Sequence, residues 1–184
     1  MSKTFAVIGD PISHSLSPNI HSAAFRELNL DCVYIGYRIP KDELEEGIEG
    51  LKKIKIEGFN VTIPHKIRIM KYLDKIDESC SLIGAANTIV NVDGNLKGYN
   101  TDMDGFLEPF KKKGLEIKNS KILLLGAGGA ARAIVAGFAK EKAKSIDIAN
   151  RTIENANNLS EFAKKIGLHA NVKKIEDIDT SIEN

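Results

Sequence analysis

Four short polar segments in the first half of the chain carry side chains that could bind a small polar molecule and move a proton. They are residues 13–18 (SHSLSP), 60–66 (NVTIPHK), 85–88 (AANT) and 98–102 (GYNTD). The first offers two hydroxyls, on Ser15 and Ser17, beside a predicted helix start, where unpaired backbone N–H groups favour a carboxylate. The other candidate side chains are Thr62, Lys66, Asn87 and Asp102.

Lys66 and Asp102 add an ammonium group and a carboxylate to these segments. Groups of this kind can bind a polar ligand and exchange protons with it. Each residue also has a plainer interpretation on its own: Lys66 as a solvated lysine, Asp102 as an acid favoured at a helix start, and Ser17 as an N-cap.

A glycine-rich segment in the second half has the spacing of a dinucleotide-binding loop. Residues 126–131 (GAGGAA) directly follow a predicted strand and precede a predicted helix, which is the context that the G-x-G-x-x-A pattern requires. The first glycine allows a tight turn, the second lets backbone N–H groups approach a pyrophosphate, and the small third residue lets helix and strand pack closely. The candidate pyrophosphate residues are Gly126, Ala127, Gly128, Gly129, Ala130 and Ala131; a glycine-rich turn without a ligand is the alternative.

The residues after the next predicted strand favour NADP over NAD. Where NAD-binding folds carry an acid about 20 residues on, this chain has Asn150, Arg151 and Thr152. An acid would repel a 2′-phosphate, whereas Arg151 can pair with one bidentately and stack beside the adenine. Asp147 lies too early to replace the missing acid. The alternative is that Arg151 is a solvated residue at the start of a helix.

Alternating strand and helix patterns predict an α/β fold, and most of the strands are expected to pair in parallel because parallel strands need long crossovers. In the first half we expect strands at 4–9, 32–38, 58–63, 87–92 and 96–99 and helical segments at 18–28, 41–54, 66–72 and 78–83. In the second half we expect helices at 102–113, 130–142 and 153–166 and strands at 122–125, 145–149 and 170–173.

Two helices in the first half have a predicted inward face, and one turn is specified by its residues. The first helix should bury Ile20, Ala23, Ala24 and Leu28, and the second should bury Leu44, Ile48 and Leu51. Asp93-Gly94 is a hairpin signal. We divide the chain into a substrate-binding domain at 1–101, a connecting helix and linker at 102–119, and a partial Rossmann-like NADP-binding domain at 120–184.

Composition and charge limit the kinds of partner that we expect. The 184 residues are 42% hydrophobic and have a net charge of +1, so a core can form without disulfides or a structural metal. The one tight basic run, residues 111–113, has no aromatic residues between its lysines, and we expect no nucleic-acid partner. Cys32 and Cys80 lie far apart without histidines at ligand spacing, so we interpret both as buried free thiols and expect no metal site.

The apolar segments are too short or too interrupted for a secretion signal or a membrane span. Residues 5–8 are shorter than the apolar core of a signal peptide, and residues 122–139 are broken by glycines and Arg132. We therefore expect a cytoplasmic protein without a membrane partner.

Six motifs, in order, resemble those of the shikimate dehydrogenase family. They are residues 9–18 (GDPISHSLSP), 60–66 (NVTIPHK), 84–88 (GAANT), 100–102 (NTD), 126–131 (GAGGAA) and 150–152 (NRT), and the resemblance covers residues 4–152. It implies an NADP-dependent, reversible reduction of 3-dehydroshikimate to shikimate in aromatic amino-acid biosynthesis. A small molecule is then the partner, and the protein is a monomer or homodimer.

The resemblance also assigns roles to individual residues. It places carboxylate binding on Ser15 and Ser17, and ring-hydroxyl contacts on Thr62, Lys66, Asn87 and Asp102, with Lys66 and Asp102 as the catalytic pair. It places the pyrophosphate on residues 126–131 and the adenosine phosphate on Asn150, Arg151 and Thr152.

Members of this family usually continue well beyond the length of this chain, so we expect a chain truncated after the first part of its nucleotide-binding domain. Three alternatives stay open. The chain could bind shikimate without turning it over, it could accept quinate, or it could be a methylene-tetrahydrofolate dehydrogenase of similar two-domain plan. The paired serines argue against the folate enzyme and only weakly against quinate.

Overall fold

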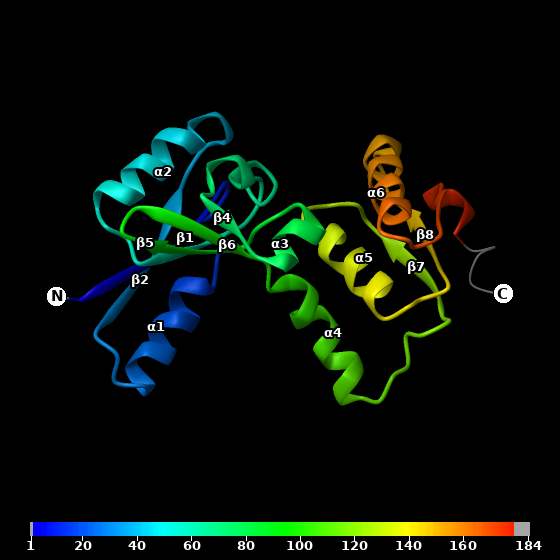
Figure 1. The fold of residues 1–184 in the computed structure, drawn as a ribbon, viewed down its shortest axis with the longest axis horizontal. Helices are drawn as coiled ribbons and strands as arrows, with labels where there is room; N and C mark the ends of the chain where they lie inside the picture. The colour runs from blue at the N-terminus through cyan, green and yellow to red at the C-terminus, as the bar shows by residue number, and fades with distance from the viewer. Residues whose placement is uncertain (1, 179–184) are drawn as a thin grey trace. The chain divides into compact units, whose positions relative to one another are not determined.

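Residues 2–178 are described in the computed structural model, and their contacts separate Met1–Asn100 (unit 1) from Thr101–Asn184 (unit 2) (Figure 1). Both units combine strands with helices, which confirms the predicted α/β class. None of the described helices has the length and the run of apolar residues that spanning a lipid bilayer requires.

Unit 1 is built on a sheet of six strands. The strands are β1 (Lys3–Gly9), β2 (Cys32–Arg38), β3 (Gly58–Val61), β4 (Lys75–Ile76), β5 (Thr88–Val92) and β6 (Asn95–Tyr99), in the order β2-β1-β3-β5-β6-β4. The helices are α1 (Ser17–Glu27), α2 (Leu44–Lys53) and α3 (Glu78–Ile83), with 3-10 turns at Lys41–Glu43 and Arg68–Tyr72. β1 pairs in parallel with β2 and β3, whereas β5 is antiparallel to both β3 and β6. The sheet is therefore mixed, and only part of it has the expected parallel pairing.

The α2 face of this sheet forms the main core of unit 1. Leu44, Ile48 and Leu51 are buried on α2, as predicted, and they pack with Ala6 and Ile8 of β1. Figure 1 shows α2 and α1 on opposite faces of the sheet. Alternate residues of β1 consequently face different helices.

The predicted orientation of α1 is wrong. The helix buries none of its residues fully, and Ile20 and Leu28 are 63% and 65% exposed. His21 and Phe25 make its ring contacts instead: His21 stacks on Tyr34 with ring centroids 4.2 Å apart, and Phe25 lies 5.7 Å from Phe5. Because α1 is apolar on two faces, its sequence alone does not identify which face meets the sheet, and the aromatic face does so here.

Unit 2 is built on a sheet of three strands, with one helix before the sheet and two between its strands. Its strands β7 (Lys121–Leu125), β8 (Ser145–Ala149) and β9 (Ala170–Lys173) are parallel and lie in the order β7-β8-β9. Its helices are α4 (Asp102–Lys112), α5 (Ala131–Lys140) and α6 (Ile153–Lys165), with a 3-10 turn at Ile175–Asp177. The fully parallel order fits the expected nucleotide-binding plan.

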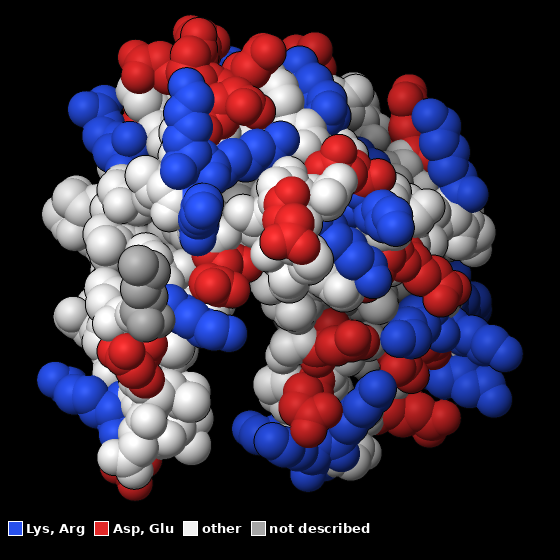
Figure 2. Space-filling model, turned by 60° about the vertical axis from the view of Figure 1, so that its left-hand side comes forward, with Lys and Arg blue, Asp and Glu red and all other residues white. Residues whose placement is uncertain are grey.

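The helix α4 packs against α5 within unit 2. The ring of Phe138 on α5 meets Phe106 and Phe110 of α4 edge to face, at 5.3 and 6.3 Å. A Cβ on Gly137 would lie 3.3 Å from Leu107, so this glycine lets the two helices approach closely. The segment after residue 101 is thus part of the packed second unit. Figure 2 shows Lys and Arg side chains interspersed with Asp and Glu over the face in view, in keeping with the near-zero net charge.

Candidate functional site

One edge of the unit 1 sheet collects the predicted substrate residues of that unit. The parallel strands β1, β2 and β3 end at this edge, and β5, which is antiparallel to β3, begins there. Ser15 and Ser17 follow β1, Thr62 and Lys66 follow β3, and Asn87 immediately precedes β5. Loops at the carboxyl ends of parallel strands are where open α/β sheets bind ligands. Asp102, the sixth candidate, is the first residue of α4 and belongs to unit 2.

The serines are arranged differently from the simplest expectation. The helix α1 starts at Ser17, its N-cap residue is Leu16, and no side chain of the described residues caps it directly, so the N-cap interpretation of Ser17 is wrong. Instead the Ser15 hydroxyl accepts a hydrogen bond from the Ser17 N–H at 3.3 Å. Ser15 and Ser17 are half-buried. The Ser15 hydroxyl keeps its own hydrogen to donate to an oxygen of a ligand.

Close approach of two strand ends fixes the loop that carries Thr62 and Lys66. A Cβ on Gly9 would lie 2.5 Å from Thr62 Cγ2 and 2.8 Å from the Ile63 carbonyl oxygen, so only glycine fits there. The Thr62 N–H donates to the Ile8 carbonyl at 2.9 Å. The end of β1 therefore positions the loop that follows β3.

A backbone hydrogen bond also links Lys66 to the segment before β5. The Lys66 carbonyl oxygen accepts from the Ala86 N–H at 2.8 Å, which ties the loop to the segment that carries Asn87. The neighbouring His65 is fully buried, and its Nε2 donates to the Ile39 carbonyl at 2.7 Å. His65 thus ties this loop to Ile39. The Lys66 side chain is half-buried.

Side-chain hydrogen bonds fix the amide of Asn87. Thr88 donates its hydroxyl hydrogen to Asn87 Oδ1 at 2.9 Å, and the same hydroxyl accepts from Asn60 Nδ2 at 3.1 Å. Asn60 Nδ2 also donates to the Asn87 carbonyl at 3.1 Å. Since a hydroxyl has one hydrogen, the Thr88 bond determines that the amide nitrogen of Asn87 is the end turned away from Thr88.

Tyr34 extends this network to the next strands. Its hydroxyl donates to Asn60 Oδ1 at 2.6 Å, and burial raises the pKa of Tyr34 to about 12, so the hydroxyl keeps its hydrogen over the physiological pH range. Tyr34, Asn60 and Thr88 were not among the sequence candidates. Asn60 was the available signal, because a polar residue between two buried strand residues, Phe59 and Val61, needs hydrogen-bond partners.

The glycine-rich loop of unit 2 depends on its backbone. Gly126 has a φ of +106°, which L side chains rarely adopt, and its N–H donates to the Ala149 carbonyl at 2.7 Å. The Ala127 N–H donates to Asn150 Oδ1 at 3.1 Å, and Asn150 Nδ2 donates to the Thr152 carbonyl at 2.8 Å. Asn150, a predicted cofactor residue, therefore links the glycine-rich loop to the segment that follows β8.

The loop leaves room for a ligand at its second glycine. A Cβ on Gly128 would meet no heavy atom within 4 Å. Among the described residues, no side chain caps the N-terminus of α5, and its first turn contains no acid. Open space and uncapped backbone N–H groups at a helix start suit a pyrophosphate, so the residues present fit a dinucleotide.

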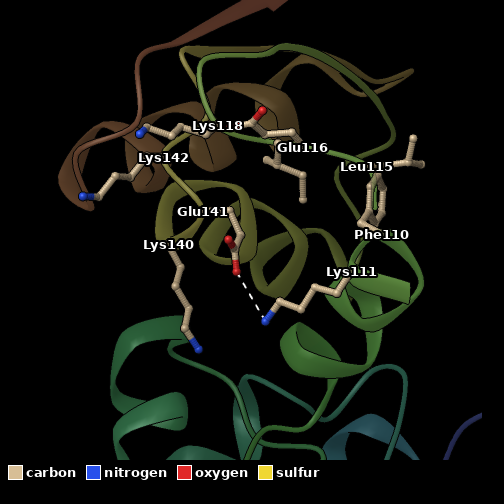
Figure 3. A pocket seen from close by; sticks show the side chains of 9 residues that line it. Phe110, Lys111, Leu115, Glu116, Lys118, Lys140, Glu141 and Lys142 are labelled. Carbon is tan, nitrogen blue, oxygen red and sulfur yellow. Dashed lines mark ion pairs between the residues drawn. The ribbon is translucent and has the colours of Figure 1, made fainter. Parts of the chain in front are cut away.

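The predicted adenosine-phosphate residues lie at the end of β8. Arg151 and Thr152 are exposed, and Asn150 and Arg151 line a cavity of about 400 Å³. A second cavity of unit 2, of about 380 Å³, lies between the carboxyl ends of α4 and α5 (Figure 3). There Lys111 pairs with Glu141 at 3.5 Å. This second cavity contains none of the predicted site residues.

Among the residues whose side chains are described, no group of three or more His, Cys, Asp or Glu side chains is arranged to hold a metal ion. Cys80 is buried, and burial, followed by the nearby Asp77, raises the pKa of its thiol to about 12. Cys32 is only half-buried, so the prediction of two buried thiols is wrong for it.

The chain matches known proteins over most of its length. Residues 7–89 match the family model described as shikimate dehydrogenase substrate binding domain, and residues 109–184 match the model described as shikimate / quinate 5-dehydrogenase. The whole chain is 80% identical to the NADP(+) shikimate dehydrogenase of Nitrosopumilus maritimus, covering 67% of that protein. Over 89% of the chain, identity with the enzyme of the same name from Caldanaerobacter subterraneus is 46%, covering 58% of that protein.

A solved structure has the same fold. Shikimate 5-dehydrogenase from Listeria monocytogenes, in complex with shikimate and NAD, matches with a TM-score of 0.86 and 38% identity, over 97% of this chain and 63% of that one. The chain thus spans between 58% and 67% of the length of the relatives named here.

Proposed function

Since the chain belongs to the shikimate dehydrogenase family, we propose that it acts in the NADP-dependent, reversible reduction of 3-dehydroshikimate to shikimate in aromatic amino-acid biosynthesis. One observation carries the proposal: hydroxyl, amide and ammonium groups from three loops meet at a single edge of the unit 1 sheet. That set matches a ligand with a carboxylate, several hydroxyls and a reducible carbonyl.

The substrate is bound by the groups at this edge. Ser15 and Ser17, at the start of α1, hold the carboxylate, because hydroxyl hydrogens and helix N–H groups both favour an anion. Thr62 and Asn87 hold ring hydroxyls. The Asn87 amide is set in advance by Thr88, so the substrate does not have to order it.

Lys66 and Asp102 handle the proton. NADPH, when bound, supplies the hydride. Lys66 Nζ gives a proton to the oxygen on which negative charge develops, and in the reverse direction it takes the hydroxyl proton. Asp102 orients the ammonium group and stabilises its charged form. The anchored carbonyl of Lys66 keeps this side chain at the substrate edge.

The cofactor is bound by unit 2. The pyrophosphate lies against the open backbone at Gly128 and the start of α5, and Arg151 pairs with the 2′-phosphate. Both relatives carry NADP(+) in their names, whereas the Listeria structure contains NAD, so the test compares the two nucleotides.

The test follows NADPH absorbance after adding 3-dehydroshikimate, beside calorimetric titration with shikimate. We expect NADPH to be oxidised, NADH to be used poorly, and shikimate to bind. Shikimate binding without oxidation of either nucleotide would contradict turnover and support a binding role alone. In the reverse direction, NADP reduction is measured with shikimate and with quinate. Equal rates with the two substrates would identify a quinate-accepting enzyme instead.

A further inference from the structure

The cavity beside Arg151 is formed by two neighbouring strands. β8 and β9 are parallel and in register, with Ala149 opposite Lys173, so the residues that follow them leave the sheet side by side. The cavity of about 400 Å³ is lined by Asn150, Arg151, Ile153, Lys174, Ile175 and Glu176. The segment after β9 therefore contributes half of a site of which only the β8 half was predicted.

We propose that Lys174 is a second cation for the ribose 2′-phosphate and sets the preference for NADP over NAD, an inference that rests on the proposed function. A phosphate monoester carries about −1.5 to −2 charges and three acceptor oxygens at neutral pH. The planar guanidinium of Arg151 can pair with two of those oxygens, which leaves the third, and part of the charge, to another donor. Among the described residues that line the cavity, Lys174 is the other cation.

The rest of the lining fits the adenosine. Ile153, the first residue of α6, and Ile175 are 49% and 47% exposed, which gives the cavity apolar surface on both of its strand ends. The flat faces of adenine bury such surface favourably. Glu176 would repel the phosphate and is the one acid among the described lining residues, which together carry a net charge of +1.

The residue before Lys174 provides a matched control. Lys173 is on the same strand end, but its ammonium lies 3.8 Å from Asp147 Oδ2, and it does not line the cavity. Asp147 also accepts from Asn171 Nδ2 at 2.9 Å, so this cluster is tied to the sheet. Removing either lysine changes the net charge by the same amount, and only Lys174 is expected to change binding.

The experiment titrates the 184-residue chain with 2′,5′-ADP and with 5′-AMP, which differ by the 2′-phosphate and lack the nicotinamide. For Lys174→Gln we expect binding of 2′,5′-ADP to weaken about fivefold to tenfold and that of 5′-AMP less than about twofold, in the range of a charge-assisted contact to an exposed group. Lys174→Arg should keep the preference, and Lys173→Gln should leave both affinities within about twofold of wild type. Glu176→Gln should tighten 2′,5′-ADP alone.

The outcomes distinguish failure of the Lys174 role from failure of the proposed NADP dependence. If Arg151→Gln removes the preference for 2′,5′-ADP and Lys174→Gln does not, the role of Lys174 is refuted and NADP dependence stands. Equal losses for both ligands in Lys174→Gln, or an equal effect of Lys173→Gln, also refute it. If the wild-type chain itself does not prefer 2′,5′-ADP, the NADP part of the proposed function fails, and this inference fails with it.

Discussion

The two units prepare their binding groups in opposite ways. At the edge of unit 1, ligand-binding side chains are oriented by other side chains, as Asn87 is by Thr88 and Asn60. In unit 2 the glycine-rich loop is shaped by the backbone conformation at Gly126. It is joined to the end of β8 by the Gly126 N–H bond to the Ala149 carbonyl and by the side-chain amide of Asn150. Under the proposed function, the first site would select a ligand by the pattern of its hydroxyls, and the second would accept a phosphate that every dinucleotide shares.

The difference determines where substitutions matter. In unit 1 the supporting residues come from three strands, and each takes part in one to three hydrogen bonds of about 1 kcal/mol apiece. In unit 2 the support is concentrated in a segment between Gly126 and Asn150. In unit 1, substitutions at several positions should each weaken ligand binding moderately. In unit 2, a few substitutions near the glycine-rich loop should weaken it strongly.

The largest expected effect is that of Lys66→Ala. Loss of the proton donor should lower kcat for 3-dehydroshikimate reduction by about 10²- to 10⁴-fold, while shikimate affinity changes far less. Turnover is measured by NADPH oxidation and affinity by calorimetry, with the surface substitution Lys71→Ala as control. Near-normal turnover combined with lost binding would show that Lys66 belongs to binding and not to chemistry.

Alanine at two glycines of the same loop should separate folding from binding. Gly126→Ala forces a side chain into φ +106° and should cost roughly 1–3 kcal/mol of stability, seen as a lower Tm. Gly128→Ala adds a methyl into open space, so its Tm should stay near wild type while NADP binding weakens more than about tenfold, because the methyl occupies the place of the pyrophosphate. Unchanged NADP affinity in Gly128→Ala would mean that the phosphates do not approach this residue.

Thr88→Val tests whether the Thr88 hydroxyl orients the amide of Asn87 in unit 1. The substitution keeps the shape and removes the hydroxyl that orients Asn87, so shikimate affinity should fall about fivefold to tenfold. Thr88→Ser retains the hydroxyl and should recover most of the affinity. Binding of 2′,5′-ADP serves as the internal control, since unit 2 is untouched. Equal losses in the valine and serine variants would point to packing of the methyl group instead of orientation of the amide.

The smallest expected effect concerns the stability contributed by Tyr34, which changes only at alkaline pH. Burial raises its pKa from 10.0 to about 12, so the folded state favours the protonated phenol. That contribution to stability is complete below pH 10 and disappears as pH rises through 12. Urea unfolding across this range should show a steeper loss for wild type than for Tyr34→Phe, which has no phenol to ionise. Parallel curves would mean that Tyr34 ionises as readily folded as unfolded.

Local patterns were sufficient for most elements. The strands at 32–38, 145–149 and 170–173 and the helix at 78–83 have the predicted bounds, and at 145–149 the alternation of polar and apolar residues specifies the strand. The hairpin at Asp93-Gly94 was also predictable, since both residues adopt positive φ, at 51° and 85°. The two-residue strand β4 was not, because its position is set by pairing with β6.

What the sequence could not supply was the contact between distant residues. Candidate site residues could be named from their types and their place after strands. The bond from Asn60 to Thr88 depends on the antiparallel register of β3 and β5, where these residues lie opposite each other. Arg151 and Lys174 likewise line one cavity because of the register of β8 and β9. Registers are tertiary information, so the supporting residues stayed hidden.

The shallow packing of α1 has a consequence for how the substrate site responds to its ligand. A helix that buries none of its residues fully is expected to open more readily than the sheet beneath it, and its amide hydrogens should exchange with solvent early. Ser15 and Ser17 lie at the start of that helix. A carboxylate bound there would slow exchange along the whole of α1, so part of the binding energy would be spent on ordering and the affinity for shikimate would carry an entropic penalty.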